Sequence, residues 1–377
     1  MRLGGVWKVL AGVVLVVLAV WRPGVASVGG AAVGWWAVLA AVQVGLLVGA
    51  LVAGVRVSLV VIGVGGEVRT WTRPGRRVVL RNVPLLMSVG LTSVREPVRV
   101  RLWCTALVAA VVLGAVVGAA WVAAAGEAGS GFWRGFAVAG SAVAVNALWP
   151  RRRPGTTSVG WFLFSLPRLE GRPLEEYEAT PLLNRVTDAI AVGDLDRAEA
   201  LADELVERYP ALLVSTGARV AVLSLRTRYL EALQVVSGLA GRQDLGPRDM
   251  AFVMAQMAGS TVNALEGGLV PLEVGVPAVR NSLDGAVKLG YPRYRCAGTL
   301  ARLALLEDDH ATAFTLANQA RQTSEDGLDR ADALATMARA QMASGDNAAA
   351  RATLAEAEQL AGWLPRVAET SARLNIA

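Results

Sequence analysis

Four runs of apolar residues in the N-terminal half of the chain are long enough to cross, or nearly cross, a lipid bilayer. They cover residues 6–21, 31–53, 102–125 and 132–149. A helix needs roughly 20 apolar residues to span the hydrocarbon core, so the pattern predicts about four membrane spans, the first and last of them short. The first run also resembles a signal peptide. Trp21-Arg22-Pro23 is a poor approach to a cleavage site, which favours an uncleaved helix.

Between the second and third runs, short stretches rich in β-branched residues alternate with turn residues. Residues 55–62, 67–72 and 77–82 are separated by Gly65-Gly66 and by Pro74-Gly75. Such stretches, bounded by glycine and proline, are typical of short antiparallel strands. We therefore expect a small β insertion over residues 55–98, at the cytoplasmic surface of the membrane.

The C-terminal half has the pattern of amphipathic helix pairs. Short turns are followed by a small residue on the next helix, at Ala198, Ala232, Ala313 and Ala350. Their spacing resembles that of tetratricopeptide repeats, in which a small residue allows two helices to cross closely. The sequence thus predicts a mostly α fold. It consists of a membrane domain over 1–165, a linker over 166–181 and a cytoplasmic α-solenoid of TPR-like helix pairs over 182–377.

Composition and charge agree with a membrane protein. The chain has 377 residues, of which 54% are hydrophobic and only 18% charged, and its mean hydropathy is +0.44. The net charge of +6 does not require nucleic acid as a partner, because the arginines flank the apolar runs, mainly over 56–101 and at Arg151-Arg152-Arg153. By the positive-inside rule these segments are cytoplasmic. We expect a multi-pass protein of the plasma membrane, with the N-terminus and the repeat domain in the cytoplasm.

Few residues are suited to metal or redox chemistry. The chain has a single histidine, His310, which lies in the repeat region, and two cysteines, Cys104 and Cys296, which form neither a disulfide framework nor a metal pair. Catalytic zinc sites and acid–base dyads usually need an imidazole. We therefore predict no cofactor and no bound metal.

The order of several segments resembles the site-2 proteases, a family of intramembrane zinc metalloproteases. The segments are Gly54-Val55-Arg56-Val57, Ile62-Gly63-Val64-Gly65, Asn82-Val83-Pro84-Leu85, Asn146 with Pro150, and Gly160-Trp161. The resemblance covers residues 31 to about 170. It implies a helical membrane domain with a zinc site, formed in that family by a His-Glu-x-x-His motif and a later aspartate.

In this chain the family's ligand positions hold other residues. Counting back from Gly54, the first histidine, the glutamate and the second histidine fall on Val42, Gln43 and Leu46, and the aspartate falls on Val159. In the motif, two histidines four apart share one helical face and hold zinc, and the glutamate acts as general base. Aliphatic side chains have no lone pair to offer, so the resemblance implies a degenerate, inactive member of the family.

A simpler interpretation of the same helix stays open. Residues 31–53 would then form an ordinary membrane span, in which Gln43 makes a hydrogen bond to another helix. Gly45 and Gly49 would provide small-residue packing against a partner helix.

These patterns lead to a functional hypothesis of a pseudoprotease that binds rather than cleaves. A membrane-protein client would enter a cleft near Gln43, Gly45, Asn146 and Pro150, and the repeats would bind a cytosolic protein, with the lipid bilayer as the remaining partner. Two alternatives remain: an active metalloprotease with unrecognised ligands, and a simple membrane-anchored TPR scaffold.

Overall fold

The structure is a computed structural model, and it describes residues 24–73, 75–126, 131–153, 156–324 and 326–376. The described chain is mostly helical and divides into two compact units, residues 1–184 and 185–377. The boundary falls inside helix α6 (Thr180–Ala191). The first predicted span, residues 6–21, lies outside the described residues.

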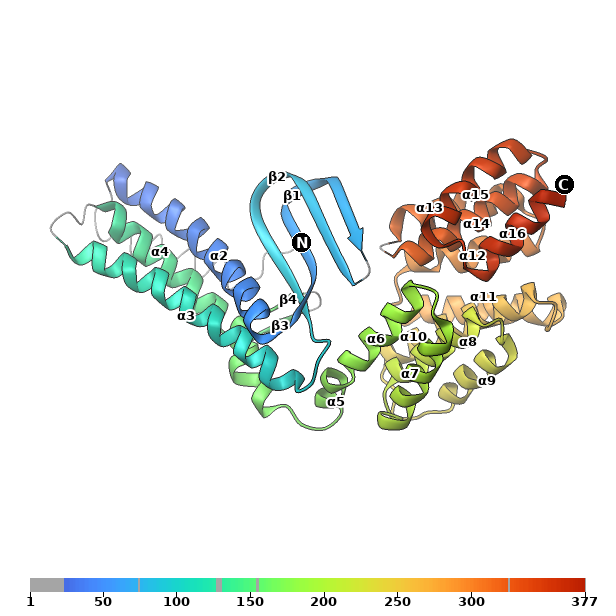
Figure 1. Ribbon diagram of the computed structural model, residues 1–377, viewed down its shortest axis with the longest axis horizontal. Helices are drawn as coiled ribbons and strands as arrows, with labels where there is room; N and C mark the ends of the chain where they lie inside the picture. Colours follow the sequence, from blue (N-terminus) through green and yellow to red (C-terminus); the bar gives the residue numbers. More distant parts are fainter. Residues whose placement is uncertain (1–23, 74, 127–130, 154–155, 325, 377) are drawn as a thin grey trace. The chain divides into compact units, whose positions relative to one another are not determined.

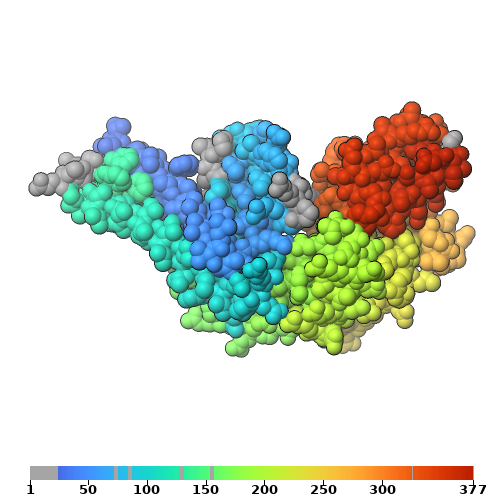
Figure 2. All heavy atoms as spheres, viewed as in Figure 1, coloured from blue at the N-terminus to red at the C-terminus, as the bar shows by residue number. Residues whose placement is uncertain are grey.

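Three long helices form the frame of the first unit. They are α2 (Val25–Ala53), α3 (Val98–Ala125) and α4 (Gly131–Leu148), and each packs against the other two (Figures 1 and 2). Only α2 and α3 are both long and apolar enough to cross a membrane, so the described residues contain two such helices. Helix α4 coincides with the predicted fourth span but has only 18 residues, including Arg134 and Asn146, which lower its hydropathy.

Glycines let α2 approach both neighbouring helices. A Cβ added to Gly49 would lie 2.5 Å from the carbonyl oxygen of Thr105 on α3, and one added to Gly34 would lie 2.5 Å from that of Phe136 on α4. Small residues at such crossings allow helix backbones to pack closely, as in membrane helix pairs. Helix α2 ends at Gly54, whose φ of 66° is the left-handed conformation that terminates many helices.

The β insertion between α2 and α3 consists of two long strands, β1 (Arg56–Arg73) and β2 (Arg76–Thr92). The register pairs Arg56 with Thr92 at one end and Arg73 with Arg76 at the other. In between, Val60 has a partner on each side, Val89 and Val78, because the strands bend (Figure 1). The sheet packs against α2 through both strands.

Short elements follow α4 in the first unit. They are β3 (Arg152–Arg153), β4 (Thr156–Thr157), η1 (Trp161–Ser165), η2 (Leu166–Arg168) and α5 (Arg172–Glu178). The segment 166–181, expected to be a linker, therefore contains helical turns. Tyr177 of α5 stacks on Trp161 with ring centroids 5.6 Å apart, and the guanidinium of Arg152 lies over both rings. Aromatic packing therefore occurs in a segment that was expected to be a linker.

The second unit is built of successive helices, each packed against a neighbour in sequence. After α6 they are α7 (Leu195–Arg208), α8 (Leu213–Leu225), α9 (Tyr229–Ala240), α10 (Pro247–Glu266), α11 (Leu272–Lys288), η3 (Arg293–Cys296), α12 (Ala297–Leu306), α13 (His310–Thr323), α14 (Gly327–Ala343), α15 (Asn347–Ala361) and α16 (Pro365–Ile376). Alternate helices α8, α10, α12, α14 and α16 also contact one another in turn.

The turns recognised in the sequence begin helices of this second unit. Asp194, Asp309 and Asp346 are the N-cap residues of α7, α13 and α15, and each side chain accepts a hydrogen bond from a main-chain N–H of the first turn. The small residues that follow are fully buried: Ala198, Ala232, Ala313 and Ala350. Small residues therefore lie inside the helix packing of this unit.

Candidate functional site

The three positions that the predicted resemblance assigns to zinc ligands lie in one apolar cluster. Val42, Leu46 and Val159 are 7%, 8% and 3% exposed, and they share a buried core with residues of α3 and α4. Val42 and Leu46 are four residues apart and so lie on one face of α2. The chain therefore brings these distant positions together, but with side chains that cannot bind a metal ion through lone pairs.

Gln43 makes a contact with the sheet. Its side-chain oxygen Oε1 accepts a hydrogen bond from the main-chain N–H of Val89 in β2, at 3.0 Å. The two residues are 46 positions apart, so the bond ties the middle of α2 to the sheet. The sequence left an interhelical hydrogen bond open for Gln43, whereas the partner in the structure is a strand.

Gly45 forms part of the contact between α2 and α3. A Cβ added to Gly45 would lie 2.8 Å from Cα of Ala109. At that distance the α3 backbone would have to move. Gly45 therefore allows close helix packing, one of the two roles that the sequence left open for it.

Asn146 and Pro150 lie at the C-terminal end of α4. Asn146 is 9% exposed, and the guanidinium of Arg151 donates hydrogen bonds to its main-chain and side-chain oxygens. Pro150 follows the end of α4 and is exposed. Of the four residues expected to line a client cleft, Gln43, Gly45 and Asn146 thus make contacts within the unit.

A second group of polar residues, which the sequence did not single out, lies inside the helical unit. Glu266 at the end of α10 pairs with Arg302 and, at 3.0 Å, with Arg366, while Arg339 lies 3.7 Å away. Burial alone would raise the pKa of Glu266, but the three arginines outweigh it and hold that pKa at about 2. Arg302 is the one charged residue of α12, which was the available signal for this cluster.

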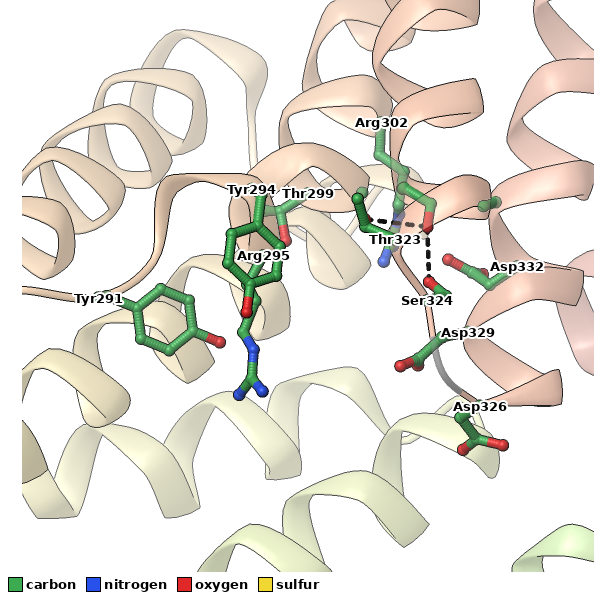
Figure 3. Close-up of a pocket in the computed structure, with 13 residues that line it drawn as sticks. Tyr291, Tyr294, Arg295, Thr299, Arg302, Thr323, Ser324, Asp326, Asp329 and Asp332 are labelled. Carbon is green, nitrogen blue, oxygen red and sulfur yellow. Dashed lines mark hydrogen bonds between the residues drawn. The ribbon is translucent and has the colours of Figure 1, made fainter. Parts of the chain in front are cut away.

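Beside this network lies a half-open cavity of about 510 Å³ (Figure 3). Tyr291, Tyr294 and Arg295 lie on one side of it, and Asp329 and Asp332 of α14 lie opposite. Burial, together with the charges of Asp326 and Asp332, raises the pKa of Asp329 to about 6, against the opposing charge of Arg295. The cavity therefore contains a carboxyl group that titrates close to neutral pH.

A second cavity of about 410 Å³ lies on the other side of the network. It is lined by Glu266, His310, Arg339 and residues of α12 and α14. Arg302 lines the first cavity and its partner Glu266 lines the second, so a buried ion pair separates the two. Nδ1 of His310 is buried without a hydrogen-bond partner.

The part of the chain that the structure describes holds no group of three or more His, Cys, Asp or Glu residues placed to bind a metal ion. Cys104 and Cys296 are free thiols, and burial raises the pKa of Cys296. No protein-family model matches the chain, and no curated protein matches it.

Proposed function

We propose that this chain is a membrane-embedded, non-catalytic relative of the site-2 proteases, which binds a membrane-protein client and a cytosolic protein instead of cleaving a substrate. The observation that carries the proposal is the buried cluster of Val42, Leu46 and Val159. In the family these positions would supply the zinc ligands. An unliganded histidine or aspartate is costly in hydrocarbon, so aliphatic residues are stable replacements once the metal is lost.

The exposure of the apolar helices supports insertion into a bilayer. In the most apolar stretch of 18 residues in each helix, only 33% of the residues are buried in α2 and 22% in α3. The core helix of a soluble protein would bury most of such a surface. Side chains such as Leu51, Val111 and Val122 are instead left exposed, as expected for residues that face lipid.

Exposed tryptophans support the same conclusion for α3. Trp103 and Trp121 are 36% and 43% exposed and lie 18 positions apart. A helix rises about 1.5 Å per residue, so they are separated by about 27 Å, close to the thickness of the hydrocarbon core. Tryptophans prefer the two membrane interfaces, and these two are spaced to lie one at each.

The arginines orient the proposed spans. Arginines lie near one end of all three described helices. Arg56 follows α2, Arg95 precedes α3, Arg99 and Arg101 lie in the first turn of α3, and Arg151 follows α4. With residues 6–21, α2, α3 and α4 as four spans, this arginine-rich end lies in the cytoplasm of a multi-pass plasma-membrane protein. The N-terminus and the helical unit are then cytoplasmic too.

The hydrogen bond of Gln43 gives the depth of the sheet in this arrangement. Gln43 lies ten positions before the end of α2 at Ala53, which is about 15 Å along the helix axis. Val89 is then near the bilayer midplane, where an unpaired strand N–H would be costly. The proposed sheet thus extends from the membrane surface inwards, and Gln43 accepts one of its main-chain N–H groups.

The helical unit supports the protein-binding half of the proposal. Neighbouring helices contact one another, and so do alternate helices, which supports an inferred α-solenoid of TPR-like pairs. Solenoids of this type bind partner proteins on an extended concave surface. A cytosolic protein is therefore the proposed second partner.

The proposal is tested by restoring the missing ligands. We expect the purified original protein to contain no stoichiometric zinc, and a variant with Val42→His, Gln43→Glu, Leu46→His and Val159→Asp to bind about one zinc ion. The control variant carries the same changes, except that it has Leu47→His instead of Leu46→His. This places the second imidazole on another face of the helix, so the control should not bind zinc. Zinc in the original protein together with chelator-sensitive proteolysis would contradict the proposal.

The hydrogen bond between Gln43 and Val89 favours a second candidate, a simple membrane-anchored scaffold, because the chain's own strand lies where the client cleft was expected. Replacing residues 1–150 by an unrelated membrane anchor separates the two. A scaffold would keep its partner interactions after the exchange. A client-binding pseudoprotease would lose crosslinks to its membrane client.

A further inference from the structure

Arginines gather at the end of the first unit where α2 stops and α3 begins. The guanidinium of Arg101 donates hydrogen bonds to the carbonyl oxygens of Ala53, at 2.6 Å, and of Glu96, at 3.2 Å. A Cβ added to Gly54 would lie 3.0 Å from Nη1 of Arg101 and 4.0 Å from Nη1 of Arg95. Both guanidinium groups therefore lie beside Gly54, although like charges repel.

Two further arginines extend this group. Arg99, in the first turn of α3, donates to the carbonyl oxygens of Leu166, Pro167 and Leu169 at 3.3, 2.6 and 2.8 Å. Arg168 donates to the carbonyl oxygen of Phe164. We refer to Arg95, Arg99, Arg101 and Arg168 as the arginine collar.

Main-chain carbonyl oxygens hold three of the four collar arginines. The side-chain hydrogen bonds described for Arg99, Arg101 and Arg168 all go to main-chain carbonyl oxygens. Each guanidinium has five N–H donors, and these bonds use only some of them. The remaining donors and the positive charge suit a phosphate group, which arginine recognises with paired N–H bonds.

Exposed aromatic residues mark the same end of the unit as a membrane interface. Trp103 lies one helical turn after Arg99 in α3. Its indole N–H donates a hydrogen bond to the carbonyl oxygen of Leu163. Trp149 and Phe164 are 63% and 48% exposed. Aromatic side chains flanked by arginines are the usual composition of a membrane surface on the cytoplasmic side.

We propose that the arginine collar binds the phosphate groups of anionic phospholipids in the leaflet where α2 ends. The proposal rests on the membrane insertion proposed above. It adds a lipid-binding site to that function and names the residues that form it. A lipid is the expected source of the phosphate, because the collar lies where α2 ends and α3 begins, at the proposed exit of this helix pair from the hydrocarbon.

Native mass spectrometry of the full-length protein in detergent tests the collar. Dioleoylphosphatidylglycerol or dioleoylphosphatidylcholine is added, and bound lipid is counted. The collar variant is Arg95→Gln with Arg168→Gln, since both side chains are exposed. The control, Arg197→Gln with Arg351→Gln, makes the same change in charge at exposed positions of the helical unit.

We expect the original protein and the control to bind the anionic lipid at least tenfold more strongly than the zwitterionic lipid. Each arginine near an anionic surface contributes about 1 kcal/mol, so the collar variant should bind the anionic lipid about thirtyfold more weakly. The proposed lipid binding by the collar would be overturned if the original protein bound both lipids equally. It would also be overturned if the collar and control variants lost equal amounts of lipid binding. Extraction of the protein from membranes by alkaline carbonate would instead overturn the proposed membrane insertion.

Discussion

Gln43 and Val89 join the middle of a long apolar helix to a strand that follows it in the chain. The amide oxygen of Gln43 accepts the main-chain N–H of Val89 at 3.0 Å. In the proposed relationship to the site-2 proteases, Gln43 occupies the position of the general base. A glutamine cannot take up a proton as a base, but it can accept a hydrogen bond. The proposed loss of catalysis thus coincides with a structural role for the same position.

Replacing Gln43 by leucine should destabilise the membrane unit by about 1 to 3 kcal/mol, because the N–H of Val89 would lose its acceptor. Hydrogen exchange of the purified protein should show faster exchange over residues 87–92. The matched control is Val44→Leu. Val44 is the next residue of α2 and is exposed, so this change should leave hydrogen exchange unaltered. Unaltered exchange in Gln43→Leu would show that the bond contributes nothing.

Apolar runs predicted the positions of the long helices, but not where they begin. The run predicted at 31–53 became Val25–Ala53 because Ser27 and Gly30 pack against α4, a tertiary contact that hydropathy does not report. The start of α3 was missed for a different reason. Arg99 and Arg101 lower the hydropathy of its first turn, while their side chains bind carbonyl oxygens nearby.

Pairings between distant residues could not be predicted from the sequence. Spacing alone indicated that Val42 and Leu46 share a helix face, and only the resemblance to site-2 proteases connected them with Val159. The partner of Gln43 depends on how β2 bends back beside α2. The ion network of Glu266 joins residues up to 100 positions apart, and no local pattern identifies such partners.

Gly49→Ala should destabilise the contact between α2 and α3. The added methyl group would lie 2.5 Å from the carbonyl oxygen and 2.9 Å from Cα of Thr105, so the two backbones must separate. Overpacking of this kind typically costs about 1 to 3 kcal/mol. Thermal unfolding in nanodiscs measures the loss.

The matched control for Gly49 is Gly118→Ala on α3. A Cβ at Gly118 meets no atom within 4 Å. Alanine also favours a helix by up to about 1 kcal/mol over glycine, so this variant should be as stable as the original or slightly more stable. Equal losses in the two variants would contradict the close packing at Gly49.

Glu266→Gln should destabilise the helical unit strongly. The change leaves the buried arginines Arg302, Arg339 and Arg366 without their shared carboxylate, and breaking a buried ion pair typically costs about 3 to 5 kcal/mol. Chemical denaturation followed by circular dichroism measures the loss. Glu358→Gln, at an exposed position of α15, should have little effect, and similar stability of both variants would refute this role.

The same carboxylate should make the helical unit sensitive to acid. The pKa of Glu266 is lowered from 4.5 to about 2, so its contribution to the free energy of unfolding is fully present above pH 4.5. It is lost as the pH falls towards 2, because the unfolded chain takes up the proton first. Unfolding midpoints of the original protein should therefore fall over this range, whereas those of Glu266→Gln should fall less.

Asp329 should have the opposite effect at higher pH. Its pKa is raised from 3.8 to about 6, so between these values the folded protein binds more protons than the unfolded chain. Stability should then decrease as the pH rises through this window, and the full penalty applies above pH 6.

Asp329→Asn removes the titrating group, so this variant should be more stable than the original protein at pH 7 and equally stable near pH 4. Protein surrounds Asp329 on the cavity wall and desolvates its carboxyl group, but the side chain still reaches solvent, so we expect a gain below about 1 kcal/mol. Unfolding midpoints measured from pH 4 to 7 test this, with Asp284→Asn at an exposed position of α11 as the control that should parallel the original. A curve for Asp329→Asn that also parallels the original would show that Asp329 titrates like an ordinary surface carboxylate.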